Sequence, residues 1–333
     1  MFVPLAEMRR LGTDALRALG FDADETSVIV DHLVDCELRG LSYAGLARIL
    51  SIADRFARSP MTDERMRVAQ ETPVSARLDG ADRIGYLVGH RATEIAVHKA
   101  TASGLAVVTA NRTWYTGMLS YYAEMITGAG MVAMLASNAT PWVAPYGGTE
   151  ARFGTNPICF GFPSEGVPVI WDIGISEIIH AQAVLAGRTG RRLPPGTAYD
   201  ETGEPTDDPA SALSGAFIAW GGHRGSGLGI AVQLLGVLAG SPALPPQLAE
   251  FGMLVLALRP DLFGDPGEFE RRVTEYASAI RATRRANPEI AVRMPFERSA
   301  AVRARRIEAG GMAVEPAVLN AVRLLAGRGS LGA

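Results

Sequence analysis

Cysteine and histidine are scarce in this chain, whose 333 residues include two cysteines and five histidines. Cys36 and Cys159 are far apart and lie in apolar sequence, which favours buried free thiols in a reducing compartment over a disulfide. The histidines are not spaced like the ligands of a metal ion. We therefore expect neither a metal site nor a disulfide framework.

Long apolar runs, basic tracts and a secretion signal are also missing. The longest apolar stretches, MVAMLA and GMLVLAL, are too short to cross a bilayer. The opening residues, MFVPLAEMRR, lack the basic and then apolar pattern of a signal peptide. The net charge is −3 and no stripe of Lys or Arg suggests nucleic acid. We expect a cytoplasmic protein without membrane or nucleic-acid partners.

The composition that remains is typical of a soluble globular enzyme. Hydrophobic residues make up 48% of the chain and charged residues 20%, and the length allows a large core in two lobes. Apolar periodicity and capping residues predict helices at 4–20, 22–40, 44–58, 84–102, 118–129, 223–240, 267–285 and 315–326, with a basic amphipathic segment at 297–311. Strands are predicted at 104–110, 131–138, 167–174 and 251–260.

Three segments carry more specific expectations. HRGSGLGIAVQLLGVLAG, at 223–240, is apolar enough to predict a buried helix. GEPTDDP, at 203–209, predicts a surface turn. The Gly/Pro-rich stretch at 140–166 is too long for an ordinary connection, and a loop of this kind inside a compact domain is usually functional.

A nucleotide-binding glycine fingerprint must follow a strand and open a helix. GAGMVA, at 128–133, has the reverse order, and GRGSLG, at 327–332, ends the chain. No GxxxxGK[ST] phosphate-binding loop is present either. The sequence therefore does not support a Rossmann domain.

Several polar groups stand where a ligand could bind. GGHRGSG, at 221–227, places Arg224 at the glycine-rich start of a helix, which suits a phosphate; the alternative is glycine-mediated helix packing. Thr155, Asp172, Ser176 and His180 lie at strand ends and could converge on a pocket, although each also fits a turn, a cap or a surface position. NRTWYTG, at 111–117, fits core packing equally well.

The segment RGLSYAG, at 39–45, has the character of a substrate-facing turn. It places Arg39, Ser42 and Tyr43 among glycines, and Arg48 follows one helical turn later. The turn contains neither histidine nor carboxylate, so the residue that would donate a proton is not evident.

Taken together and in this order, five motifs resemble the malate/L-lactate dehydrogenase-like family of NAD(P)-dependent oxidoreductases. They are LRG…GLAR, APYGG…FGTNPICFGFP, VIWDIG-S, LPPGTAYDETGEPTDDP and GGHRGSGLGI, and they span nearly the whole chain. The family includes sulfolactate and ureidoglycolate dehydrogenases and cyclic ketimine reductases that act on piperideine- and pyrroline-2-carboxylates. The resemblance implies a mixed α/β, non-Rossmann fold with a large, mainly antiparallel sheet and a homodimeric assembly. We expect a helical lobe from residues 1–75 and 295–333, and a cofactor- and substrate-binding domain from 76–294.

The resemblance also implies roles for individual residues. Arg48 would hold a substrate carboxylate in a bidentate geometry that Lys could not copy, and Thr155 and His180 would line the substrate site. The cofactor, NADPH or NADH, would contact Asp172, Ile173, Gly174, Arg224, Glu297 and Arg298. The family usually has Gly where this chain has Phe296.

Two departures concern the proton donor. Family members typically read R-G-x-D-S-H-G in the turn, so that Tyr43 replaces Ser and Ala44 replaces the proton-donating His. The acid that orients this His is replaced by Gln182, ten residues after Asp172. A second family histidine, in N-S-x-H-F-G, falls here on Trp114 or Tyr115, depending on how the segments are aligned.

These departures predict altered chemistry on a retained scaffold. Reducing a ketone needs a proton donor, whereas a protonated imine already carries its proton, so we expect reduction of an α-carboxylated imine rather than a simple 2-oxo acid. Tyr43, Tyr115 or His180 could still act as a weaker acid. One alternative is a 2-hydroxy acid dehydrogenase of the malate or lactate type that uses such a donor. Another is a catalytically inactive cofactor-binding relative.

Overall fold

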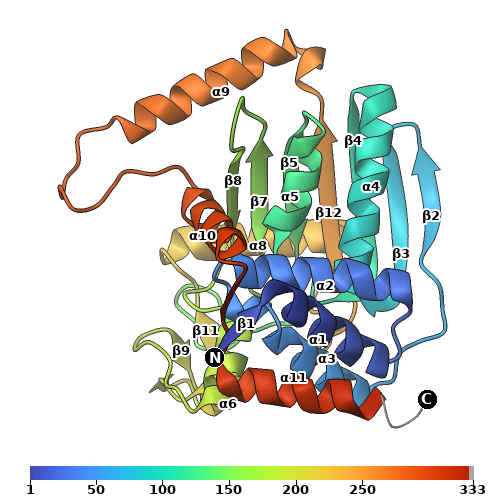
Figure 1. Ribbon diagram of the computed structural model, residues 1–333, viewed down its shortest axis with the longest axis vertical. Coiled ribbons are helices and arrows are strands. Elements are labelled where there is room, and N and C mark those ends of the chain that lie inside the picture. The colour runs from blue at the N-terminus through green and yellow to red at the C-terminus, as the bar shows by residue number, and fades with distance from the viewer. Residues whose placement is uncertain (330–333) are drawn as a thin grey trace.

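A seven-stranded sheet forms the centre of the protein, whose computed structural model describes residues 1–329 (Figure 1). In spatial order its strands are β2 (Arg67–Thr72), β3 (Ser75–Ile84), β4 (Leu105–Trp114), β12 (Phe251–Leu258), β5 (Val132–Ser137), β7 (Ile158–Phe162) and β8 (Val169–Ile173). Only β3 and β4 are parallel, and every other neighbouring pair is antiparallel. The predicted mixed α/β fold with a mainly antiparallel sheet is therefore confirmed.

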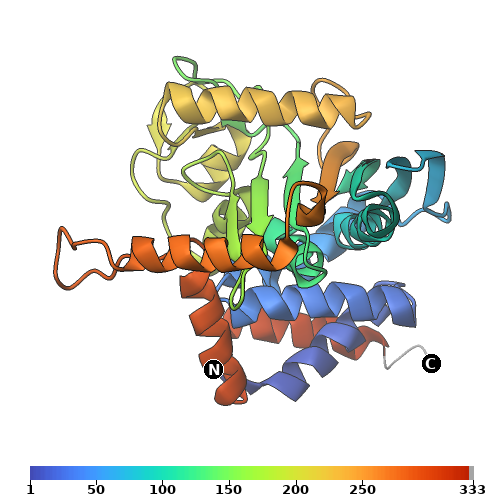
Figure 2. The same ribbon diagram turned by 90° about the horizontal axis from the view of Figure 1, so that it is seen from above.

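Helices cover both faces of this sheet. The helices α4 (Gly85–Ser103) and α5 (Leu119–Gly128) lie on one face, and α8 (His223–Leu238) lies on the other (Figures 1 and 2). In α4, Ala92, Ala96 and Ala100 recur every four residues and are completely buried against the strands. Their small side chains form a single face on which the helix packs closely on the sheet.

The N-terminal and C-terminal segments form a helical layer beyond α4 and α5. It contains α1 (Leu5–Ala18), α2 (Ala23–Leu38), α3 (Ala47–Arg58) and α11 (Pro316–Gly329). Strand β1 (Phe2–Pro4) pairs with β13 (Gly311–Ala313), which joins the two ends of the chain in one lobe (Figure 1). A capping box formed by Asp22 and Glu25 begins α2. The expected domain boundary lay after residue 75, but β2, which ends at Thr72, belongs to the same sheet as β3.

A second, smaller sheet lies beside the glycine-rich loop that follows β5. Its strands are β6 (Val143–Ala144), β9 (Ala198–Tyr199), β10 (Pro205–Thr206) and β11 (Ala216–Ile218), with helices α6 (His180–Thr189) and α7 (Pro209–Ser214) nearby. GEPTDDP contains β10 and the first residue of α7 rather than a turn alone. Strands of two or three residues show no apolar period, so the sequence did not predict them.

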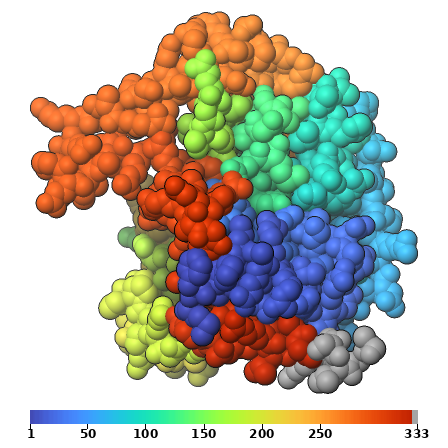
Figure 3. Space-filling model, viewed as in Figure 1, coloured from blue at the N-terminus to red at the C-terminus, as the bar shows by residue number. Residues whose placement is uncertain are grey.

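The segment after β12 leaves the body of the molecule and returns. Helix α9 (Pro266–Arg281) projects outward with only Ala277 buried, and α10 (Glu297–Glu308) brings the chain back to α2 (Figures 1 and 3). Asp35 of α2 forms an ion pair with α10. Its carboxylate lies 2.8 Å from Arg303 Nε and also 2.6 Å from Arg39 Nε at the end of α2. Asp35 is buried, so its ion pair with Arg303 ties the middle of α10 to α2.

The prediction that 223–240 forms a buried helix was half wrong. Gly229 and Gly236 of α8 face inward, where an added Cβ would lie 2.6 Å from Phe153 and 2.1 Å from Asn138. On the opposite face, Leu234 and Leu238 are 62% and 70% exposed. The apolar composition gave no indication that this face lies in solvent.

The glycine motif GAGMVA lies between α5 and β5, in the reverse of the nucleotide-binding order, as predicted. Residues 330–332 of GRGSLG lie outside the described residues. Cys36 and Cys159 are both buried free thiols. None of the helices within residues 1–329 is long and apolar enough to span a membrane.

Candidate active site

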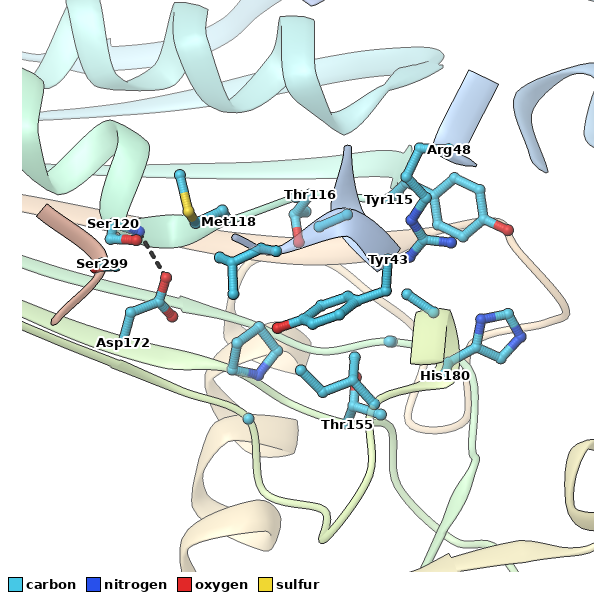
Figure 4. Close-up of a pocket in the computed structure, with 18 of the residues that line it drawn as sticks. Tyr43, Arg48, Tyr115, Thr116, Met118, Ser120, Thr155, Asp172, His180 and Ser299 are labelled. Atoms are coloured by element: carbon cyan, nitrogen blue, oxygen red, sulfur yellow. Dashed lines mark hydrogen bonds between the residues drawn. The ribbon is translucent and has the colours of Figure 1, made fainter. Parts of the chain in front are cut away.

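A pocket of about 440 Å³ lies where the helical lobe meets the ends of β4 and β8. Its volume falls in the range of ordinary small-molecule sites. The RGLSYAG turn, the 115–118 turn, β8, the start of α6 and residues 295–299 all contribute to its wall. Figure 4 places Arg48, Tyr115 and His180 toward one end, Tyr43 in the middle, and Asp172, Ser120 and Ser299 toward the other.

Arg48 supplies a positive charge to the first end of the pocket. Its guanidinium carbon lies 4.2 Å from the centre of the Tyr115 ring, over the face of that ring. Its Nη1 is buried without a hydrogen-bond partner, and none of the carboxylates in residues 1–329 forms an ion pair with it. A buried guanidinium nitrogen left in this state marks a site for an anionic group.

His180 stands beside Arg48 as a neutral imidazole. It is the first residue of α6, is 7% exposed, and stacks on Trp142 with ring centres 3.9 Å apart. Burial and then the charge of Arg48 lower its pKa to about 3. Its Nδ1 is buried without a partner. Near neutral pH His180 can therefore form a hydrogen bond to a ligand, but it is not in the imidazolium form that acts as a general acid.

The turn that precedes α3 contributes Tyr43 and Ala44. Tyr43 lies in the short 3₁₀ turn η1 (Ser42–Ala44), and burial raises its pKa to about 12, which makes it a weak acid. Ala44, which the resemblance matches to the family's histidine, lines the pocket. Gln182, which replaces the family's acid, uses its side-chain oxygen to accept a hydrogen bond of 2.8 Å from the Ile179 amide. Positions 44 and 182 therefore hold neither member of a His–carboxylate pair.

Two glycines of the turn are required for different reasons. Gly40 has a φ of +84°, a left-handed conformation that other residues adopt at a cost. Gly45 has an ordinary φ, but a Cβ there would lie 2.4 Å from the Glu37 carboxylate. Glu37 occupies this space because its Oε1 accepts a hydrogen bond of 3.0 Å from the Leu46 amide at the start of α3. The turn and Glu37 therefore depend on each other.

The opposite end of the pocket is organised by Asp172 of β8. Its Oδ2 accepts a hydrogen bond of 2.7 Å from the Ser120 amide in the first turn of α5. Burial raises the pKa of this carboxyl, and the hydrogen bonds from Ser120 oppose that effect. Arg298 and Ser299, in the first turn of α10, line the same end. A polar or anionic ligand group has suitable donors there.

Three residues near the pocket adopt the left-handed backbone conformation. Tyr115 has a φ of +52°, Asn156 of +34° and Phe296 of +75°. Such conformations cost about 1–3 kcal/mol each and concentrate at functional sites. The positive φ at position 296 suits glycine, the residue that the resemblance implies there, because glycine adopts this conformation without strain. Here the Phe296 ring packs under Arg39, 4.4 Å from its guanidinium carbon.

The structure brings most of the candidate residues named from the sequence to this pocket. Those in its wall are Tyr43, Arg48, Tyr115, Thr155, Asp172, Gly174, His180 and Arg298. Three others lie outside the wall. Ile173 is in β8, Arg224 is exposed in the first turn of α8, and Glu297 accepts from the Met294 amide while pairing with Arg281. Trp220, four residues before Arg224, donates a 2.7 Å hydrogen bond to the Gly174 carbonyl of the wall.

Sequence reasoning missed several residues of the wall. They include Tyr86, Ser120, Asn138, Trp142 and Phe251. Trp142 lies in the loop that was expected to be functional, so its aromatic ring was the one available signal. Within residues 1–329 no group of three His, Cys, Asp or Glu side chains is arranged to hold a metal ion.

The comparisons with known proteins identify the family of this chain. The family model described as malate/L-lactate dehydrogenase matches residues 3–323. The chain belongs to the malate/L-lactate dehydrogenase family. Members of this family are oxidoreductases, so the protein is an enzyme of that class.

Individual relatives extend over most of the chain. L-sulfolactate dehydrogenase of Methanocaldococcus jannaschii is 30% identical over 284 residues, covering 82% of each chain. Delta(1)-pyrroline-2-carboxylate/Delta(1)-piperideine-2-carboxylate reductase of Pseudomonas aeruginosa is 34% identical over 248 residues, covering 74% of each. A dehydrogenase structure from Sinorhizobium meliloti superposes with a TM-score of 0.90 at 28% identity, covering 98% of both chains.

The carboxyl of Glu37 predicts a pH dependence of stability. Burial raises its pKa from 4.5 to about 7, against the opposing effects of the Leu46 amide and Arg306. Between these two values the folded protein holds a proton that the unfolded chain has released, so the contribution of Glu37 to stability falls as pH rises from about 4.5 through 7. Glu37→Gln keeps an oxygen for the Leu46 amide and should remove this fall.

The measurement is urea unfolding of both proteins at pH 5 and pH 8. Glu37→Gln should lose less stability between the two pH values than the wild type, while the exposed control Glu201→Gln should match the wild type. Parallel pH profiles for wild type and Glu37→Gln would show that Glu37 does not titrate in this range.

Proposed function

We propose that this enzyme is an NAD(P)H-dependent oxidoreductase for a small α-carboxylated substrate, and that it reduces an imine in preference to a simple 2-oxo acid. The main support is the combination of a fixed cation, Arg48, with the absence of a suitable proton donor beside it. The Pseudomonas aeruginosa relative is named for two cyclic imine carboxylates, and the Methanocaldococcus jannaschii relative for sulfolactate. All of these substrates carry a carboxylate.

Arg48 is the proposed anchor for that carboxylate. A planar guanidinium can donate two parallel hydrogen bonds to a carboxylate, which fixes its orientation as well as its position. Its Nη1 is buried without a partner, and Tyr115 supports its flat face at 4.2 Å. A bound carboxylate would satisfy this nitrogen and neutralise the charge.

The residues at the opposite end fit a nicotinamide cofactor. A reduced nicotinamide supplies the hydride in enzymes of this kind. Arg298 and Ser299 begin α10 at the pocket wall, where phosphate oxygens would meet a cation and helix-start amides. Asp172, at that end, and Gly174, which also lines the pocket, would contact the cofactor. Arg224, at the exposed start of α8, would meet phosphates outside the pocket.

The preference for an imine follows from proton balance. Hydride addition to a ketone carbon pushes the C=O electron pair onto oxygen, and the resulting alkoxide requires a proton. Addition to a protonated imine pushes the C=N pair onto a nitrogen that already holds its proton, so the product is a neutral amine. His180 is deprotonated at neutral pH and the pKa of Tyr43 is about 12. Neither favours proton donation to an alkoxide.

A substrate panel tests this proposal. Purified enzyme would be assayed for NADH and NADPH consumption with 2-oxo acids, with the same acids plus ammonia or methylamine, and with cyclic imino acids. We expect kcat/KM for imines to exceed that for the matched 2-oxo acids by about 100-fold or more, the contribution of a placed acid. Efficient reduction of pyruvate or oxaloacetate would contradict the proposal and favour a 2-hydroxy acid dehydrogenase using Tyr43, Tyr115 or His180. Cofactor binding without turnover would favour an inactive relative.

Ala44→His provides the matched variant for that panel. It restores a titratable side chain at the family's position, and we expect it to raise 2-oxo acid turnover by about tenfold. Ala44→Asn adds a polar side chain without that acid and should not. Combining Ala44→His with Gln182→Asp should increase the gain further if the pair can form.

Arg48→Ala should separate substrate binding from cofactor binding. Losing a charge-assisted pair costs about 1.5–3 kcal/mol, so the KM for the carboxylated substrate should rise by about one to two orders of magnitude. The affinity for NADPH or NADH, measured by fluorescence titration, should stay within a few-fold of wild type. An equal loss of cofactor affinity would place Arg48 in the cofactor site instead. Arg10→Ala, at an exposed position, is the control.

Arg298→Ala and Arg224→Ala test the proposed phosphate contacts. Each removes one cation, so each should weaken NAD(P)H binding by about tenfold and reduce its dependence on salt. The measurement is cofactor titration at low and high ionic strength. If Arg224→Ala binds NAD(P)H with unchanged affinity, the GGHRGSG segment serves helix packing and does not bind phosphate.

A further inference from the structure

The Arg48 end of the pocket is walled mainly by apolar and aromatic side chains. Trp142 and Phe251 meet edge to face, with ring centres 6.3 Å apart and an interplanar angle of 87°. Trp142 is 8% exposed, Phe251 2% and Tyr115 6%, so these rings belong to the protein interior. Ile179 adds an aliphatic surface just before α6. A ligand group entering this space would lie mostly against carbon atoms, with the neutral His180 imidazole as a polar neighbour.

Positive charge in the pocket is limited to two separated arginines. Among the Lys and Arg side chains of residues 1–329, only Arg48 and Arg298 line its wall. Arg48 belongs to α3 and Arg298 to α10, and the next residue, Ser299, lies at the Asp172 end of the pocket in Figure 4. Once Arg48 has bound one carboxylate, its end of the pocket offers no second cation.

His180 does not supply the missing charge. Its ring is stacked on Trp142 and buried beside Arg48, and both surroundings disfavour the protonated form. Its unpartnered Nδ1 can instead serve one neutral hydrogen-bonding group of a ligand.

We propose that the enzyme selects substrates with a single negative charge: an α-carboxylate held by Arg48, with an uncharged and largely apolar side group packed against Trp142, Phe251 and Ile179. The inference rests on the carboxylate site of the proposed function. A second carboxylate or a sulfonate would be placed against rings and methyl groups without a counter-ion, which is strongly unfavourable. Sulfolactate, for which the Methanocaldococcus jannaschii relative is named, carries two anionic groups, so this enzyme would differ from that relative in substrate class.

Non-reacting acids test the selection without requiring turnover. Cyclohexanecarboxylate and phenylacetate would be compared with succinate and sulfoacetate by isothermal titration, on enzyme saturated with NAD⁺ or NADP⁺. The two monoanions should bind at least about tenfold more tightly than the two dianions. Dianions that bind as tightly as the monoanions would overturn the inference.

A charge-introducing variant gives the matched comparison. Ile179→Lys places a cation in the wall of the pocket and should shift the ratio of dianion to monoanion affinity by about tenfold toward succinate and sulfoacetate. Ile179→Met has a similar length without charge and should leave the ratio unchanged. An unaltered ratio in a folded Ile179→Lys protein would also contradict the inference, because the side group would then lie elsewhere.

Arg48→Ala distinguishes failure of this inference from failure of the proposed function. Tight dianion binding that is lost in Arg48→Ala would reject the single-charge selection and keep the carboxylate anchor. Acid binding that is absent from the wild type, or unaffected by Arg48→Ala while cofactor still binds, would reject the anchor itself and the inference with it.

Discussion

The guanidinium of Arg48 is partly buried and has no carboxylate partner in the described chain, and the arrangement of the pocket follows from this charge. Removing a charge from water is costly unless neighbouring groups compensate. The face of the Tyr115 ring compensates part of this cost. Tyr86 also forms a hydrogen bond with Arg48. Burial raises the pKa of Tyr86, and the charge of Arg48 and this hydrogen bond act in the opposite direction. The same charge helps to keep His180 neutral. An anionic ligand would complete this set of interactions.

The walls around Arg48 are held in place by contacts between distant parts of the chain. Asp35 pairs with Arg303 of α10, and Arg39, which Asp35 also holds, lies over the Phe296 ring just before α10. These contacts join α2 to the segment that carries Arg298 and Ser299. Glu37, two residues farther along α2, supports the start of α3 and with it the turn that carries Tyr43. One helix of the N-terminal lobe therefore fixes both the substrate end and the α10 end of the pocket. Its rigidity is a condition for orienting a ligand.

The two ends of the pocket differ in how closely their residues follow the motifs by which the chain resembles the family. The Asp172 carboxylate accepts a hydrogen bond from the Ser120 amide in the first turn of α5, and the motifs around Asp172 match those of the resemblance. At the other end, Ala44 and Gln182 leave the His–carboxylate pair without either member, while Arg48 remains. A fold can keep its binding groups and exchange its proton chemistry because the two depend on different side chains.

The sequence by itself determined the regular elements with long apolar periods, the absence of a Rossmann glycine turn, and the family, since five motifs occur in order along one chain. It also identified most of the polar residues of the pocket, because arginine, histidine and aspartate at strand and helix ends are visible one at a time. Only the tertiary structure decided what surrounds them. Whether His180 is charged depends on Trp142 and Arg48, which come from other segments. Burial and partnership are properties of the packed molecule, and no local pattern encodes them.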